Sequence, residues 1–324
     1  MDPPPAAPLG TAPLSTARTL RDWLAPHVPA DGLAWLDEVA ATVAAGGAGT
    51  GGAGAGGAGT SVAGTGGAGA PLPTGEAGGA PAGGAGGVDR VLFARFGTVP
   101  RKLGRAGLPP HEGLGLSGWS ADQAGRVSLL LHRPADAGFL PALDRLFAAA
   151  DLGEQVCLYR ALPLLPWPER HRARAAEGIR SSVQPVFEAV ALGNPYPADW
   201  LDEGAWNQMV LKAIFVGSPL HGIVGLDRRA NPALARMLVD YARERRAAKR
   251  PVTPELWRAV GPHASGERAL NALRDALADP DPAQQRAAAL ALAASTDPNA
   301  PAVLASRPDL AAEVAAGRIG WETL

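Results

Sequence analysis

Helix-forming residues dominate the chain from Val88 to Leu324, and prolines divide this region at short intervals. Ala, Leu, Arg and Glu recur throughout, and all four have high intrinsic helix propensity. Strand-like alternation is scarce, and the stretch RVSLLLHR at 126–133 could be either a strand or a helix. Proline begins or ends helices because it lacks an amide N–H and fixes φ. The pattern therefore predicts an all-α fold made of many short helices.

Apolar spacing together with Pro and Gly positions predicts where these helices lie. Within 169–192, the pair Gln184-Pro185 should split or kink the helix. Gly193 suits a C-terminal cap, and Asn231-Pro232 suits an N-cap followed by the first helical residue. Helices are expected near 88–97, 121–131, 136–150, 153–163, 169–192, 198–216, 230–248, 254–260, 266–278, 281–295 and 307–316.

Two helices are also expected before the main helical region. Ser15 or Thr16 can N-cap a helix that runs to about Ala25, and a second helix is expected at about 32–45. Together they predict an N-terminal helical hairpin over residues 15–45. Residues 1–14 are rich in Pro and Ala and are expected to be disordered.

A Gly/Ala-rich segment, residues 46–87, separates this hairpin from the helical body, residues 88–324. It contains one charged residue, Glu76, and no aromatic residue. Such a segment buries too little apolar surface to offset the entropy lost on ordering. We therefore expect a disordered insertion that acts as a flexible tether and is not a functional site.

The tail, residues 263–324, resembles helical repeats of the HEAT type. In LADPDPAQQRAAALALAAS, residues 277–295, an Asp-Pro-Asp-Pro turn ends one helix and begins the next. The second helix presents small apolar residues, which permit close packing of paired helices. No regular period extends along the whole chain, so the expected architecture is an irregular HEAT-like helical-repeat solenoid.

Charge and cysteine content disfavour several function classes. The chain has 30 Lys+Arg against 31 Asp+Glu, so no global charge attracts it to nucleic acid or to an anionic membrane. Its one cysteine, Cys157, excludes an intrachain disulfide and a CxxC metal site. The N-terminus lacks a secretory-signal pattern, and no strongly apolar uncharged run of about 18 residues is present. A cytoplasmic protein without a transmembrane segment is expected.

The sequence contains no recognisable catalytic or metal-binding motif. No two histidines are spaced as HxxxH, so neither a metal site nor a cofactor is expected. Cys157 lies on an apolar helical face and is expected to be a buried, inert thiol. GxSxG and Walker sequences are absent, and GLGLSG at 113–118 follows no strand. These observations leave catalysis open but favour a non-catalytic protein.

A basic run closes the helix expected at 230–248. Five cations lie within eight residues, and at a helix C-terminus such cations complement the helix dipole. The alternative is a nucleic-acid surface, which the neutral overall charge and the lack of interleaved aromatic residues disfavour. The five residues are Arg243, Arg245, Arg246, Lys249 and Arg250.

Lys212 is the only formal charge between Gly204 and Leu226. The apolar surroundings predict a packed helix, and a buried ammonium group requires an acceptor. Asp227 is the expected partner, because Asp202 lies ten residues, about 15 Å, away along an ideal helix. A lysine that extends to solvent is the alternative.

The region from 154 to 262 resembles the EboA family, through the motifs NPYP, AWNQMVLKA, GLDRRAN and DYAxER. This family belongs to a bacterial and algal gene cluster linked to specialised metabolites and to movement of a metabolite precursor out of the cytoplasm. The resemblance implies that other Ebo-cluster proteins or a small-molecule metabolite are the partners. Eight residues match the family pattern and, with Arg180, are the candidates for a ligand pocket: Asn194, Tyr196, Trp206, Asn207, Lys212, Asp227, Arg228 and Asn231.

Three functional hypotheses follow. The favoured one is a non-catalytic helical scaffold or metabolite-binding component of the Ebo pathway. The second is an enzyme acting on a small anionic or prenylated metabolite, with Lys212 as acid/base or anion anchor and Arg228 as an anion clamp. The third is a HEAT-type nucleic-acid binder that uses residues 243–250. Clustering of Lys212, Asn207 and Asp227 in one cleft would favour a pocket, and their dispersal would favour a scaffold.

Overall fold

The computed structural model describes residues 13–45 and 85–324, and within these ranges the chain forms helices, loops and two isolated β-bridges but no strand. The predicted all-α fold is confirmed. The α-helices are α1 (Pro13–Leu24), α2 (Ala30–Ala44), α3 (Ala85–Phe96), α4 (Val99–Leu103), α5 (Ala121–His132), α6 (Phe139–Ala149), α7 (Leu152–Arg160), α8 (Arg172–Arg180), α9 (Gln184–Ala191), α10 (Tyr196–Trp200), α11 (Glu203–Val216), α12 (Pro232–Ala247), α13 (Leu256–Val260), α14 (Gly266–Leu277), α15 (Pro282–Ala294), α16 (Ala300–Leu304) and α17 (Pro308–Ala315).

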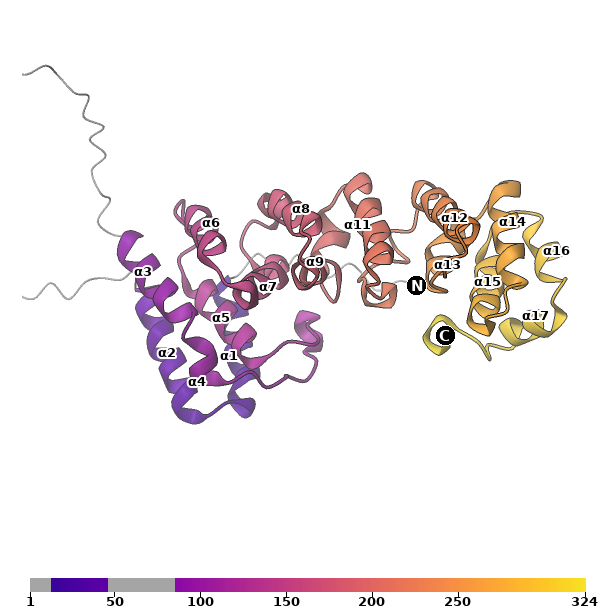
Figure 1. The fold of residues 1–324 in the computed structure, drawn as a ribbon. Coiled ribbons are helices and arrows are strands. Elements are labelled where there is room, and N and C mark those ends of the chain that lie inside the picture. Colours follow the sequence, from indigo (N-terminus) through magenta and orange to yellow (C-terminus); the bar gives the residue numbers. More distant parts are fainter. Residues whose placement is uncertain (1–12, 46–84) are drawn as a thin grey trace, which may run out of the picture.

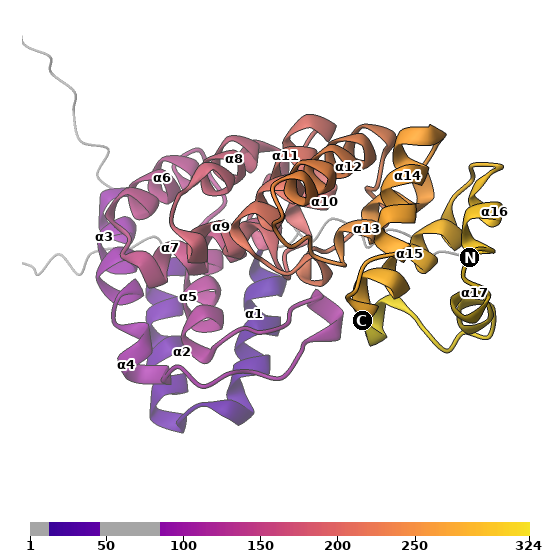
Figure 2. The ribbon, with the colours of Figure 1, turned by 45° about the vertical axis from the view of Figure 1, so that its right-hand side comes forward.

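Helices follow one another along an elongated array. α6, α8, α11, α12 and α14 form one row, and α7, α9, α13 and α15 lie beneath it (Figures 1 and 2). Each helix packs mainly on near neighbours, as α14 does on α12 and α15, while one continuous apolar core runs from Ala17 to Leu310. The array agrees with an extended helical architecture, and its assignment to HEAT-like repeats remains a prediction.

The first five helices form a cluster at one end of the array, with α5 at its centre (Figure 1). The ambiguous stretch 126–133 belongs to α5 except for its last residue, and α5 is buried on almost all sides by α1, α2, α3, α4 and α7. A helix that is buried on all sides needs no polar face, so its sequence lacks the amphipathic period of a surface helix and can resemble the sequence of a buried strand. Arg126 in α5 and Arg133, which follows its last residue, are buried and paired, Arg126 with Asp122 at 2.8 Å and Arg133 with Asp89 at 3.0 Å.

Several predicted helix bounds are revised by local chemistry. The predicted split near Gln184-Pro185 is confirmed, because α8 ends at Arg180 and α9 begins at Gln184. The single helix predicted at 198–216 was wrong. Asp202 accepts a hydrogen bond from the Ala205 amide at 2.7 Å, and this N-cap separates α10 from α11. The five-residue helices α4 and α16 were not predicted, since so short a segment shows little apolar periodicity.

The two segments expected to be disordered, 1–14 and 46–87, lie outside the described residues except at their edges. There, Pro13 and Leu14 belong to α1 and residues 85–87 belong to α3.

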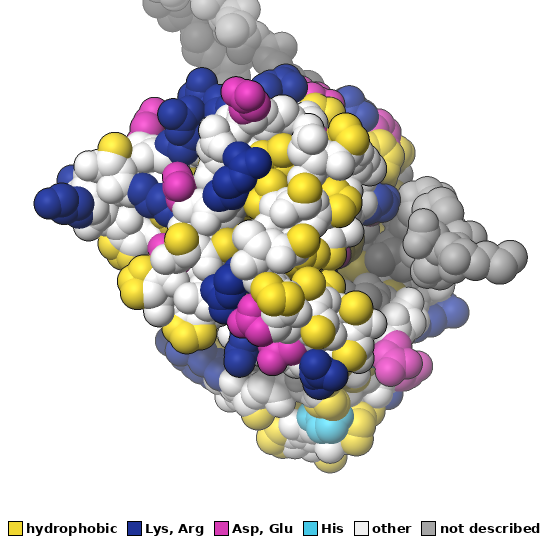
Figure 3. Space-filling model, turned by 90° about the vertical axis from the view of Figure 1, so that its right-hand side faces the viewer, with side chains coloured by type: hydrophobic (Ala, Val, Ile, Leu, Met, Phe, Trp, Pro, Cys, Tyr) yellow, Lys and Arg dark blue, Asp and Glu magenta, His cyan; other side chains and the backbone are white. Residues whose placement is uncertain are grey.

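The predicted Asp-Pro-Asp-Pro turn joins α14 to α15, and the side chain of Asp281 caps α15. At the C-terminal end of the array, hydrophobic side chains gather on the exposed face between scattered charges (Figure 3). None of the helices in the described ranges has the length and apolar character needed to cross a lipid bilayer.

Candidate functional site

Most residues predicted to form a ligand pocket make structural contacts instead. Asn194 is buried, and its amide donates to the Tyr159 and Ala189 carbonyls at 3.1 and 3.0 Å. Its Oδ1 accepts from the Tyr196 amide at 3.0 Å. These hydrogen bonds hold the turn after α9 against α7. Asn194 therefore has little hydrogen-bonding capacity left for a ligand.

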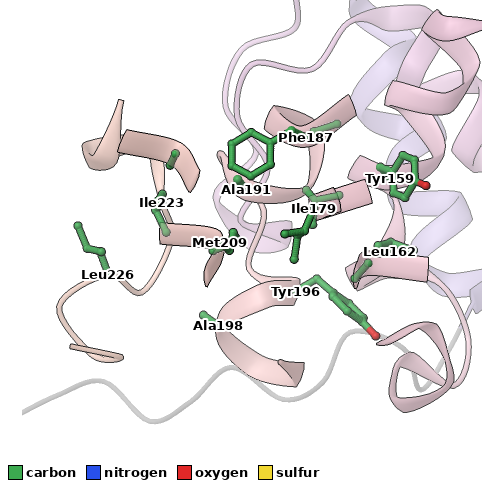
Figure 4. Packing of buried hydrophobic residues seen from close by; sticks show 14 of the residues in the cluster. Tyr159, Leu162, Ile179, Phe187, Ala191, Tyr196, Ala198, Met209, Ile223 and Leu226 are labelled. Carbon is green, nitrogen blue, oxygen red and sulfur yellow. The ribbon is translucent and has the colours of Figure 1, made fainter. Parts of the chain in front are cut away.

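Tyr196 and Trp206 are core residues. Both side chains are fully buried, and the Tyr196 hydroxyl donates to the Pro168 carbonyl at 2.6 Å. Figure 4 shows this hydroxyl directed away from Met209 and Ile179, at the edge of the cluster. Burial raises the pKa of Tyr196, which keeps the phenol protonated. Trp206 packs beneath the Arg229 guanidinium, 5.1 Å from the ring centre.

Asn207 and Asn231 bind each other across the α11–α12 interface. Asn231 Nδ2 donates to Asn207 Oδ1 at 2.8 Å, and Asn207 Nδ2 donates back at 3.3 Å. Asn231 also caps α12 by accepting from the Leu234 amide at 2.8 Å, which confirms its predicted N-cap role. The pair joins two neighbouring helices and uses most of its hydrogen-bonding capacity internally.

The predicted ion pair between Lys212 and Asp227 was wrong. Lys212 Nζ donates to the Ile179 and Ser181 carbonyls at 2.5 and 2.7 Å, at the C-terminal end of α8, and lies 4.9 Å from the Phe187 ring centre. Helix ends present unpaired carbonyls and partial negative charge, so they can satisfy an ammonium group without a carboxylate. Desolvation lowers the Lys212 pKa from its ordinary value.

Asp227 and Arg228 are instead paired with other residues near the surface. Asp227 accepts two hydrogen bonds from Arg258, at 2.8 and 2.7 Å, and Arg228 donates to Asp199 at 2.6 Å. Glu177 lies three residues before Arg180 but bonds to Arg174 at 2.5 Å. Lys212 and Asp227 therefore serve different contacts and do not share one polar cleft.

A surface groove lies between α6, with the loop before it, and the helical segment formed by η5 (Pro168–His171) and α8. We call it the α6–α8 groove. Two adjoining hollows of about 560 and 350 Å³ share Leu140, Asp144 and Arg170. The larger is also lined by Ala135, Asp136, Ala137, Pro141 and Trp167, and the smaller by Leu143, His171, Ala173, Arg174, Glu177 and Arg180.

Acidic groups in the smaller hollow are engaged by one arginine. Arg174 donates to Asp144 at 2.7 Å and to Glu177 at 2.5 Å. Burial by itself would lower the pKa of Arg174, but these two carboxylates hold it above its ordinary value. Arg170 and Arg180 are exposed, and their side chains make no hydrogen bond or ion pair with any described residue. Their guanidinium groups are thus available to a ligand.

His171 and Trp167 form the inner wall of this groove. His171 is buried, and its Nε2 donates to the Pro166 carbonyl at 2.8 Å. Burial lowers its pKa below the usual 6.5, which favours the neutral ring. Trp167 lies between two prolines with a φ of 54°, a conformation uncommon outside glycine, and packs edge-on against Phe139. The two side chains therefore form a wall without formal charge.

Reactive groups are scarce around the groove. Its lining includes no Ser, Thr, Cys, Lys or Tyr, and the possible nucleophiles that remain are Asp136, Asp144, Glu177 and His171. Cys157 is buried elsewhere, in the core, and burial raises its pKa to about 12, so it is an inert thiol as predicted. Across the described residues, no three His, Cys, Asp or Glu side chains are grouped so that they could hold a metal ion.

A smaller hollow, about 220 Å³, lies between α12 and α14, beside Arg236 and the ion pair of Asp240 with Arg268.

The basic run at the end of α12 is partly used in packing. Arg245 donates to the Pro251 carbonyl at 3.0 Å, and Arg246 donates to the Ala272 carbonyl at 2.9 Å. These contacts leave fewer free cations than the sequence presents.

Sequence reasoning found Arg180 but missed Arg170, His171 and Trp167. The signal was present in LLPWPERHRAR, residues 164–174, where a tryptophan stands between two prolines ahead of a basic helix start. Prolines in such a pattern predict helix boundaries and do not by themselves indicate a binding site. No local pattern reveals that α6 lies opposite this segment.

The chain matches a known protein family. The family model described as "Metabolite traffic protein EboA" matches residues 84–261, more than half of the chain. The match begins well before residue 154, where the sequence motifs led us to expect it, and it includes every residue that lines the α6–α8 groove. No curated protein and no solved structure matches the chain.

Proposed function

The chain belongs to the EboA family, and from this premise we propose that it is a non-catalytic component of the Ebo pathway that binds a metabolite in the α6–α8 groove. The observation that supports this most directly is the groove itself. It combines two adjoining hollows, an apolar wall and two unpaired arginines within the family-matched region. Small-molecule sites typically combine a mostly apolar lining with a few polar groups.

Binding is favoured over catalysis by the chemistry of the lining. An enzyme in this groove would need an acid, base or nucleophile free to act on its substrate. Asp144 and Glu177 are both held by Arg174, and Asp136 by Arg133 at 2.9 Å. Lys212, the acid/base of the enzymatic alternative, is bonded to the end of α8. The enzymatic hypothesis has no other named acid or base in its favour.

We place this function in the cytoplasm, where the protein would hold a pathway intermediate and present it to other Ebo-cluster proteins. The absence of a membrane-crossing helix from the described residues is compatible with such a role. A helical array offers an extended surface for protein contacts beside the groove. Nucleic acid is not expected as a partner.

The test is a steric block of the groove. Ala173 is exposed and lines the smaller hollow, so Ala173→Trp should fill it without changing charge. Ala148→Trp on α6 is the matched control, because Ala148 is also exposed and helical but does not line the groove. Both variants and the parent protein are purified from cells that express the pathway, and small molecules released on denaturation are identified by mass spectrometry.

We expect a metabolite that accompanies the parent protein and Ala148→Trp and is lost from Ala173→Trp. Matching thermal melts of the three proteins would show that the loss comes from blocking and not from unfolding. A metabolite retained at the same level by Ala173→Trp, or no metabolite in any of the three preparations, would contradict binding in this groove.

A further inference from the structure

We propose that the ligand of the α6–α8 groove is an amphipathic anion, with a phosphate or carboxylate group bound at Arg170 and attracted also by the charge of Arg180, and with an apolar body over Leu140 and Trp167. This inference rests on the proposed function and adds the chemical class of the metabolite. It follows from how charge and apolar surface are distributed along the groove.

The charge balance of the smaller hollow points to an anion. Arg174 is already bonded to Asp144 and Glu177, at 2.7 and 2.5 Å, so these three groups form an internal network. Arg170 and Arg180 remain without an ionic partner among the described residues. A guanidinium group binds phosphate or carboxylate oxygens through paired N–H donors, which makes these two residues suitable anchors.

Other groups at this hollow do not oppose an anion. The His171 ring donates its Nε2–H to the Pro166 carbonyl. Its lowered pKa favours the neutral ring, which carries no negative charge. Glu177 is the nearest acid in sequence to Arg180, and it bonds to Arg174 instead. The recognition of charge therefore depends on Arg170 and Arg180.

The larger hollow supplies the apolar half of the site. Its lining is mainly Ala135, Ala137, Leu140, Pro141 and Trp167, and it shares Arg170 with the smaller hollow. Its acid Asp136 is bonded to Arg133 at 2.9 Å, and this contact lowers the Asp136 pKa. An anion held at Arg170 thus has apolar surface directly beside it, which favours a ligand with both kinds of group.

Trp167 makes this apolar surface rigid. The residue is fixed between Pro166 and Pro168 with a positive φ, and its ring packs edge-on against Phe139 at a centroid distance of 6.0 Å. A side chain with little freedom loses little entropy when it contacts a ligand. Figures 1 and 2 show α6 and α8, the helices that line the groove, as neighbours in the same row.

The experiment compares four small probes by isothermal titration calorimetry on the full chain. Octyl phosphate and octanoate carry both an acid and a chain, inorganic phosphate carries the acid alone, and 1-octanol carries the chain alone. We expect octyl phosphate or octanoate to bind about tenfold more tightly than phosphate and 1-octanol. Whichever of the two acids binds more tightly identifies phosphate or carboxylate as the preferred group. Rising salt should weaken binding of the preferred probe, because screening reduces its attraction to the arginines.

Paired variants assign the effect to the groove. Arg170→Gln with Arg180→Gln should reduce the affinity for the preferred probe at least about tenfold, since a charge-assisted contact at Arg170 and the attraction of the Arg180 charge are both lost. Arg95→Gln with Arg243→Gln is the matched control, because these arginines are exposed, unpaired among the described residues and outside the groove. Neither pair should alter the melting temperature.

Equal affinity for octyl phosphate, octanoate and 1-octanol, or equal losses in the two double variants, would overturn the inference. These outcomes are separable from failure of the proposed function. If mass spectrometry finds a metabolite that Ala173→Trp excludes but that has no acidic group, the groove binds a metabolite and only its assigned chemical class is wrong.

Discussion

Backbone carbonyls satisfy several of the polar side chains that the sequence presented as possible site residues. Lys212 donates to two carbonyls at the end of α8, Asn194 to two in α7 and α9, and His171 to that of Pro166. Each carbonyl belongs to a helix end or a turn, where intrahelical bonding is incomplete. A polar residue in an apolar helix therefore needs no ligand to explain it when a helix end lies within reach.

Lys212→Met tests the contribution of this contact. The methionine retains much of the apolar stem but leaves the Ile179 and Ser181 carbonyls without their donor. We expect the free energy of unfolding, measured by urea titration, to fall by about 1–3 kcal/mol. Lys102→Met is the control, since Lys102 is exposed and should change stability by less than about 0.5 kcal/mol. Equal small effects of both substitutions would show that Lys212 behaves as an ordinary surface lysine.

His171 should make stability depend on pH. Burial lowers its pKa in the folded protein below 6.5, so between these two pKa values the unfolded chain binds the proton more readily. The contribution of His171 to the free energy of unfolding is therefore complete above about pH 6.5 and is lost as the pH falls toward the pKa of the folded protein. The free energy of unfolding should change by at most about 1.4 kcal/mol per pH unit.

The measurement is urea unfolding at about pH 7.5 and about pH 5. His171→Gln keeps an N–H donor for the Pro166 carbonyl but cannot titrate. Its stability should fall less on acidification than that of the parent protein. Parallel losses in the two proteins would mean that other groups account for the pH dependence.

At the scale of the element, small residues decide how closely the helices pack. The small-residue face predicted for the helix at 281–295 is present in α15, where Ala287, Ala288 and Ala291 are fully buried. Gly261, in the short helix after α13, approaches this face so closely that a Cβ atom would lie 2.8 Å from Ala291 Cα. The closeness of α15 to this segment thus depends on the absence of one methyl group.

Gly261→Ala should separate these elements. The backbone φ at this position is −47°, which alanine adopts without strain, so the substitution isolates the packing effect. We expect a loss of about 1–3 kcal/mol in urea unfolding. Gly107→Ala is the control, because no atom lies within 4 Å of its added Cβ. A Gly261→Ala variant as stable as the control would show that the array absorbs the methyl group by local adjustment.

At the scale of the whole molecule, the N-terminal cluster is built from both sides of the Gly/Ala-rich segment. α1 and α2 precede it in the chain, yet they pack on α5, and Ser128 of α5 donates to the Ala17 carbonyl at 3.2 Å. α2 and α3, the helices on either side of the segment, also pack against each other. The hairpin predicted at 15–45 thus contributes to the same apolar core as the helices that follow.

Replacing residues 46–84 with a Gly-Ser linker of about ten residues should leave the fold intact. The expectation comes from the composition of the segment, which offers no aromatic or charged anchor apart from Glu76. The melting temperature should change by no more than a few degrees. A chain that begins at residue 85 is the contrasting variant, because it lacks α1 and α2 and should melt far lower. A large decrease in the linker variant would show that the replaced segment packs against the folded part.

The sequence by itself determined the properties that depend on neighbouring residues. These include the all-α class, the split before Gln184-Pro185, the N-cap at Asn231 and the Asp-Pro-Asp-Pro turn, because proline geometry and capping act over a few residues. Long motifs likewise identified the family. Only the tertiary structure decided which distant groups meet. The carbonyl acceptors of Lys212 lie 33 and 31 residues away in the chain, and Asp227 binds Arg258. Leu140 and Arg180 line the same α6–α8 groove. Such partners depend on how helices pack in three dimensions, and the spacing of neighbouring residues does not specify which distant helices come into contact.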